Sequence, residues 1–305
     1  MNVVSPHVFR DNSSYFQIST RFDEQHGALW CILDPKPRAC FTLEVLAEIR
    51  RFQCGVERLA EAGGKSGCPV RYVILASRTP GVFNFGGDLA LFARCIQEND
   101  PGSLREYGKA CIDVLHPQTT GYNLPITTIS LVQGDALGGG FEAALCSDVL
   151  IAERNTQMGF PEVMFNLFPG MGAYQLLDRR LGATRAERML LNGKLYRAEE
   201  LHAEGIVDIL AETGRGENAL YEHIVRNSTR GNAREGVLKV RRRMRPVRYE
   251  QLLEVVDIWV ETAMRIGKKE IRLMERLARS QERLTGGGQG PLVPRGEMAP
   301  AQPAG

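Results

Sequence analysis

The sequence predicts an α/β fold in which helices cover a sheet. Apolar runs typical of buried strands, such as 73–76 and 128–132, are each followed by a glycine-rich turn and then by a helical pattern. Repeated strand–turn–helix units of this kind build a sheet with helices packed on it. The chain has 305 residues, of which 43% are hydrophobic, so it can bury a sizeable core in one large domain or in one domain with an appendage.

The N-terminal half alternates strands and helices. Residues 43–61 show the helical signal clearly, because Leu46, Ile49, Phe52 and Val56 recur near helical spacing. Predicted strands lie at 15–20, 28–33, 70–77, 128–132 and 149–152, and predicted helices lie at 43–61, 89–97, 104–115 and 139–146.

The C-terminal part has a helical pattern. Beyond Ala173 this pattern is broken at Gly182, Gly205, Gly214 and Gly231, and residues 252–284 are predicted to form one long helix with an apolar packing stripe. The basic run 239–245 is predicted to be a solvated helix face; the alternative is a dock for an acidic carrier protein or for CoA phosphates. Residues 285–305, rich in Gly, Pro and Ala, are predicted to be a disordered tail.

Composition excludes several classes of function. A net charge of +2 gives no general attraction to nucleic acid or to an anionic membrane, and no apolar run approaches the ~20 residues that span a bilayer. Seven cysteines without paired short spacings argue against a zinc site or a disulfide framework, and nothing calls for a metal or another cofactor. The N-terminus lacks the features of a secretory signal, so a cytoplasmic location is expected.

Two glutamates beside glycine-rich turns are the candidate acid and base. Glu142 closes the segment Gly-Gly-Gly-Phe-Glu, and Glu162 closes Gly-Phe-Pro-Glu. Alone, a glutamate in the first turn of a helix is more often a partner of the helix dipole. Glu142, however, lies in a strongly apolar stretch, where an unpaired charge is costly and a raised pKa suits proton transfer.

The glycine turns themselves are candidate binding sites for a developing negative charge. Where a strand leads into a helix, the first backbone N–H groups have no partner inside the helix and point beyond the strand end. Two such turns that converge can hold a carbonyl oxygen as it gains charge. A glycine turn alone more often reflects close packing, whereas glycine turns and glutamates occurring together indicate a catalytic site.

Three motifs in this order resemble those of the crotonase (enoyl-CoA hydratase/isomerase) superfamily. They are Val-Phe-Asn-Phe-Gly-Gly-Asp-Leu at 82–89, Gly-Gly-Gly-Phe-Glu at 138–142 and Pro-Glu at 161–162. The resemblance implies that the N–H groups of Gly87 and Gly139 form an oxyanion hole and that Glu142 and Glu162 are the acid/base pair. It also implies a spiral of ββα repeats with a helical C-terminal region, assembled as trimers or hexamers.

Longer strings resemble one branch of that superfamily, the diffusible signal factor (DSF) synthases of bacterial quorum sensing. These strings are 82–92, 138–145, 167–174 and 258–264. The branch implies dehydration of a 3-hydroxyacyl thioester on acyl carrier protein (ACP) to a cis-2-enoyl thioester, followed by hydrolysis that releases the unsaturated fatty acid. The resemblance places the following residues in the substrate pocket: Phe85, Gly86, Leu137, Gly138, Met171 and Trp259.

Alternatives of two kinds stay open. An ordinary enoyl-CoA hydratase keeps both glutamates, so the catalytic motifs alone do not separate ACP from CoA substrates. A regulatory partner of a sensor histidine kinase is the alternative from another class, although a pure binding module does not need Glu142 and Glu162. Which glutamate is the acid, and whether the product is cis or trans, does not follow from sequence. The predicted division is a catalytic core at 1–185, a helical region at 186–284 that roofs the pocket and makes oligomer contacts, and the tail at 285–305.

Overall fold

The computed structural model describes residues 15–63, 68–228 and 231–285 and contains a six-stranded sheet. In spatial order its strands are β1 (Ile18–Asp23), β2 (Ala28–Leu33), β3 (Tyr72–Ser77), β5 (Thr127–Val132), β7 (Val149–Glu153) and β10 (Ile209–Ala211). Only β1 pairs antiparallel, with β2; every other neighbouring pair is parallel. Residues 1–14 lie outside the described residues, and so does nearly all of the predicted tail, at 286–305.

A second, four-stranded sheet alternates with the first along the chain. Its strands are β4 (Val82–Asn84), β6 (Asp135–Leu137), β8 (Gln157–Gly159) and β9 (Leu195–Arg197). A strand of the large sheet, a strand of the small sheet and a helix form one repeat. The helices that close the three repeats are α2 (Leu89–Gln97), α4 (Gly139–Leu145) and, after the short 3₁₀ helix η5 (Pro161–Phe165), α5 (Ala173–Leu181). This arrangement confirms the predicted spiral of ββα units.

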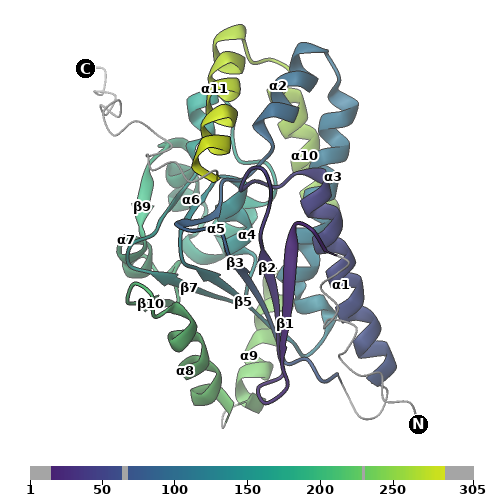
Figure 1. The fold of residues 1–305 in the computed structure, drawn as a ribbon, viewed down its shortest axis with the longest axis vertical. Coiled ribbons are helices and arrows are strands. Elements are labelled where there is room, and N and C mark those ends of the chain that lie inside the picture. The colour runs from purple at the N-terminus through teal and green to yellow at the C-terminus, as the bar shows by residue number, and fades with distance from the viewer. Residues whose placement is uncertain (1–14, 64–67, 229–230, 286–305) are drawn as a thin grey trace.

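Helices cover both faces of the large sheet (Figure 1). Alternate residues of β2 divide between two cores, as strand geometry requires. Leu29 and Cys31 face the main core with α1 (Leu43–Gly63) and α3 (Pro101–Thr120), whereas Trp30 faces a smaller core beneath α8 (Gly216–Ser228). The remaining helices are α6 (Ala183–Leu191), α7 (Ala198–Ala203), α9 (Gly231–Met244), α10 (Tyr249–Ala263) and α11 (Lys268–Thr285). No helix within the described ranges is long and apolar enough to cross a bilayer.

The structure corrects three sequence predictions. The single helix predicted at 252–284 is wrong, because α10 ends at Ala263 and α11 begins only at Lys268. The helical pattern predicted beyond Ala173, broken only at glycines, is incomplete: two strands, β9 and β10, also form there, by pairing with β8 and β7. The first strand lies three residues further along the chain than predicted. For β9 and β10, pairing with strands distant in sequence outweighed local periodicity.

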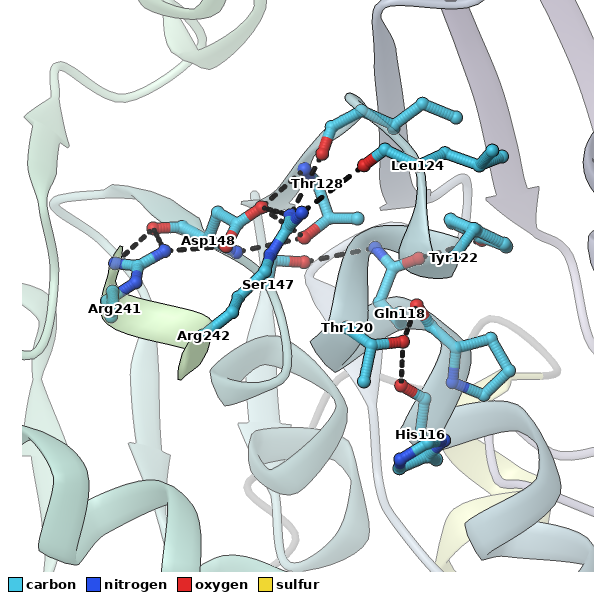
Figure 2. Close-up of polar contacts among 12 residues, drawn as sticks. His116, Gln118, Thr120, Tyr122, Leu124, Thr128, Ser147, Asp148, Arg241 and Arg242 are labelled. Carbon is cyan, nitrogen blue, oxygen red and sulfur yellow. Dashed lines mark hydrogen bonds and ion pairs between the residues drawn. The ribbon is translucent and has the colours of Figure 1, made fainter. Parts of the chain in front are cut away.

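The basic run at 239–245 is neither a fully solvated face nor a free docking site. Arg241 and Arg242 converge on the buried carboxylate of Asp148, with one N–O distance of 2.6 Å to each carboxylate oxygen (Figure 2). Asp148 also accepts the backbone N–H of Thr128 at 3.1 Å. Arg242 donates to the carbonyl of Ile126 at 2.9 Å and so ties α9 to the segment that leads into β5.

Asp148→Ala is expected to destabilise the protein strongly, because it leaves two guanidinium groups facing a cavity without their counter-charge. Breaking a buried pair from one side costs ~3–5 kcal/mol, and we expect about 3 kcal/mol because Arg241 is partly solvated. Urea unfolding measures this loss. Asp257→Ala is the matched control, since it removes an exposed partner of Arg105 and should cost below about 1 kcal/mol. Equal losses in the two variants would contradict a structural role for the Asp148 cluster.

Candidate active site

The two glycine turns meet, as the oxyanion-hole hypothesis requires. A Cβ placed on Gly86 would lie 2.8 Å from the backbone nitrogen of Gly139, and one placed on Gly139 would lie 3.4 Å from the nitrogen of Gly87. Gly86 has φ +89°, so glycine also suits its backbone conformation. Among the described residues, neither the Gly87 nor the Gly139 N–H donates a hydrogen bond. Two unpaired amide donors therefore lie side by side.

The glycine turn at 82–89 is held in place by one of its own side chains and by one from α3. Asp88 caps α2 by accepting the N–H groups of Ala90 and Leu91, at 3.1 and 3.2 Å. The buried hydroxyl of Tyr107, on α3, accepts the Asp88 N–H at 3.2 Å and donates to the carbonyl of Phe41 at 2.6 Å. The position of Gly87 therefore depends on α3 as well as on its own turn.

Glu142 lies in the first turn of α4 and is 2% exposed. Its Oε1 accepts the backbone N–H groups of Met171 and Ala173, both at 2.9 Å, at the start of α5. Burial raises the pKa of Glu142 to about 7, although the two N–H donors favour its ionised form. Glu142 can therefore exchange a proton near neutral pH.

Glu162 lies on η5 with its carboxyl group against the backbone of Gly138. Its Oε2 is buried and has no hydrogen-bond partner among the described residues. Burial, followed by the charge of Glu142, raises the pKa of Glu162 to about 8. Because Glu142 has two donors and Glu162 Oε2 has none, a single proton shared by the pair is favoured on Glu162.

One apolar cavity of about 130 Å³ joins these groups. Its lining includes the two glutamates, Gly87 and Gly139. It also includes the predicted pocket residues Phe85, Leu137, Gly138, Met171 and Trp259. Gly86 is the one predicted pocket residue outside the lining; it packs behind Gly139 instead. Segments more than 100 residues apart thus contribute to one chamber.

The cavity lining also includes residues that sequence reasoning missed. Side chains of α1, α3 and β2 line it, among them the polar groups of Gln53 and Gln118, and Tyr122 joins them from the 3₁₀ helix η4 (Gly121–Asn123). The Tyr122 hydroxyl donates to Gln118 at 3.0 Å, and Gln118 donates to Ser147 at 3.1 Å (Figure 2). Gln53 could have been predicted as a cavity residue from the sequence, because it lies between Phe52 and Cys54 on an otherwise apolar face of the helix.

The cysteines in the lining do not act as nucleophiles at neutral pH. Burial raises the pKa of Cys31 and of Cys146 to about 12, and burial also raises the pKa of Cys111. All three therefore remain thiols, and the thiolate is the reactive form. The titrating groups in this cavity near pH 7 are the two carboxyls.

Gly138→Ala is expected to lower turnover of an enoyl thioester by about 100-fold, because a displaced catalytic group costs that much. Gly138 has φ +53°, and an added Cβ would overlap the Glu162 carboxyl. Gly205→Ala is the matched control, with φ +76° and open space around the added methyl. Both variants should lose about 1–3 kcal/mol of stability from backbone strain. Similar activity in the two variants would show that Gly138 does not position Glu162.

Comparison with known proteins places this chain in a family. The enoyl-CoA hydratase/isomerase family model matches residues 65–228, more than half of the chain. The chain is 32% identical over 200 residues to the fatty acid oxidation complex subunit alpha of Vibrio cholerae. This match covers 65% of this chain and 26% of that protein. It is 31% identical over 157 residues to human mitochondrial methylglutaconyl-CoA hydratase, which covers 52% of this chain and 44% of that protein. The chain thus spans less than half the length of either relative.

The fold is also similar to that of a solved enoyl-CoA hydratase. The crystal structure of enoyl-CoA hydratase from Bacillus halodurans superposes with a TM-score of 0.69 at 20% identity, covering 86% of this chain and 99% of the other. At this identity the superposition shows a shared fold alone. Together with the family match, it shows that the chain belongs to the enoyl-CoA hydratase/isomerase family, the crotonase superfamily.

Proposed function

We propose that this protein is a DSF-type synthase that dehydrates 3-hydroxyacyl-ACP to cis-2-enoyl-ACP and then hydrolyses the thioester to a free cis-2-unsaturated fatty acid. The observation that carries the proposal is the cavity, which contains two buried carboxyls and two free amide N–H groups and continues between α1, α3 and the sheet. An apolar chamber reaching that far into the core suits a medium or long acyl tail. The DSF-branch strings around the site support the same reading.

Dehydration uses the carboxyl pair and the two amide donors together. One carboxylate takes the proton from C2, and the other carboxyl, protonated, gives its proton to the C3 hydroxyl. The C2–H and C3–O bonds break, a C2=C3 bond forms and water leaves. Charge that builds on the thioester oxygen is held by the N–H groups of Gly87 and Gly139, each worth on the order of 3 kcal/mol.

Hydrolysis reuses the same groups. A carboxylate removes a proton from water, which attacks the thioester carbonyl, and the oxyanion lies between the same two N–H groups. The C–S bond breaks, the carrier thiol takes up a proton and the carboxylic acid departs. No nucleophile besides water is required, in keeping with the protonated cysteines.

The alternative within the family is hydration of an enoyl-CoA, because the same pair can add water across C2=C3. The two relatives above, one of them named a CoA hydratase, favour this second candidate. Association with a sensor histidine kinase and assembly as trimers or hexamers are further proposals that rest on the resemblance alone.

Incubation with 3-hydroxyacyl-ACP in H₂¹⁸O tests the proposal. We expect a free acid that carries one ¹⁸O in its carboxylate and a cis double bond, both read by mass spectrometry after chromatography. Crotonyl-CoA is the parallel substrate. Fast hydration of crotonyl-CoA with no free acid from acyl-ACP would contradict the proposal and favour an ordinary hydratase.

The pH dependence of kcat/KM should be a narrow bell. Below the pKa of about 7 at Glu142 both carboxyls are protonated and no base remains, and above the pKa of about 8 at Glu162 both are ionised and no acid remains. Activity should therefore peak between these values and fall about tenfold per pH unit beyond them. Initial rates across pH 5–10 provide the measurement, and a flat profile down to pH 5 would contradict a shared proton.

A further inference from the structure

The outer face of α11 is a basic stripe beside the opening of the acyl cavity. Lys268, Lys269, Arg272, Arg276 and Arg279 are all exposed. With 3.6 residues per turn these five cations fall within an arc of about 100° around the helix axis. The opposite face of α11 supplies Met274, Leu277 and Gln281 to the cavity lining. One helix therefore contacts the acyl chamber on one face and carries these five cations along the opposite face.

The stripe lies at the entrance rather than at the inner end of the cavity. Met164, on η5, is the most exposed residue of the lining at 38%, and half-buried Leu89 begins α2. α11 packs against both α2 and η5, and it lies beside α2 in Figure 1. A thioester carrier that delivers its acyl group through this opening would meet α11.

The charge of the stripe is not balanced within the described part of the chain. None of its five cations forms an ion pair there. The acidic residues of α11 are directed elsewhere: Glu270 accepts the Gly267 N–H at 3.1 Å, Glu275 accepts from Gln97 at 2.9 Å and Glu282 lies 3.9 Å from Arg38. By contrast, the basic run on α9 already uses Arg241 and Arg242 for Asp148.

We propose that this α11 stripe docks an acidic acyl carrier protein, an inference that rests on the proposed acyl-ACP substrate. Lys268 and Arg279 are separated by roughly 16 Å along the helix, at 1.5 Å per residue. A cationic row of that length complements an acidic helix of a partner better than a single cluster of nucleotide phosphates. Charges at such a rim steer encounter and raise the association rate, so affinity should depend on ionic strength.

A charge-reversal variant tests the docking surface. Arg272→Glu, Arg276→Glu and Arg279→Glu are combined, and the Kd of a fluorescently labelled bacterial acyl carrier protein is measured, so that the readout does not depend on turnover. The matched control combines Arg58→Glu, Arg226→Glu and Arg243→Glu, three exposed arginines on α1, α8 and α9 with the same change in net charge. Thermal melting checks that both variants are folded.

We expect the stripe variant to weaken carrier binding at least about tenfold, the lower end of electrostatic steering effects, and the control to stay within about twofold. Turnover of the same acyl group on N-acetylcysteamine, which lacks both carrier and nucleotide, should be unchanged.

Equal weakening in both variants, or none in the stripe variant, overturns the inference. Slower turnover of the CoA thioester with unchanged carrier binding also overturns it, because nucleotide phosphates would then occupy the stripe. If carrier binding depends on the stripe but wild-type protein releases no fatty acid from any thioester, the docking surface stands and the proposed function fails.

Discussion

Glu142→Gln and Glu162→Gln are each expected to lower fatty-acid release by about two to four powers of ten, the scale of a lost general acid or base. Glutamine keeps the shape of the side chain but neither takes nor gives the proton. At position 142 its carbonyl oxygen can still accept the N–H groups of Met171 and Ala173, so the fold should be preserved. Single-turnover rates with 3-hydroxyacyl-ACP are the measurement.

The stability of these variants is an independent check. Burial raises the pKa values of both glutamates, so ionisation of the two carboxyls destabilises the folded protein above pH 8. Replacing either glutamate by glutamine should therefore leave the melting temperature above pH 8 unchanged or higher. Glu217→Gln, at an exposed ion pair with Arg21, is the control for a harmless exchange. Near-wild-type turnover in both active-site variants would rule out the acid/base assignment.

Trp259→Ala is expected to cost ~3–5 kcal/mol of stability, as for other buried tryptophans. The indole is 2% exposed, lies edge-to-face with Phe92 at 5.0 Å between ring centroids, and packs against Gly170. Its loss enlarges the acyl cavity. The released acids should therefore shift to longer chains or lose their selectivity, at ~0.8 kcal/mol for each newly buried CH₂. Urea unfolding and mass spectrometry of the products measure the two effects.

Trp30→Ala separates the two consequences. Trp30 is equally buried but belongs to the core beneath α8, away from the cavity lining. The Trp30→Ala exchange should lower stability by a similar amount and leave the distribution of acyl-chain lengths in the released acids unchanged. If Trp259→Ala also leaves that distribution unchanged, Trp259 is a packing residue and the tail contacts other walls, such as those of α1 and α3.

The sequence by itself determined the class of fold and the chemistry-bearing groups. Strand, glycine turn and helix follow one another within a few residues, so local preference and apolar periodicity were enough to predict them. Glu142 is next to its glycine turn, and Glu162 follows Gly159 by three residues. The likeness to known motifs therefore depended on short strings, which need no knowledge of distant contacts.

Only the tertiary structure decided which distant groups meet. Strands β9 and β10 have three residues each and exist because β8 and β7 offer them partners. The pairing of Arg241 and Arg242 with Asp148, and the polar residues Gln53 and Gln118 in the cavity lining, join segments far apart in the chain. The same holds for the α11 stripe, which became a candidate docking surface only when the other face of that helix was found at the acyl cavity. Such contacts depend on burial and on counter-charges supplied across the fold, and local periodicity does not encode either.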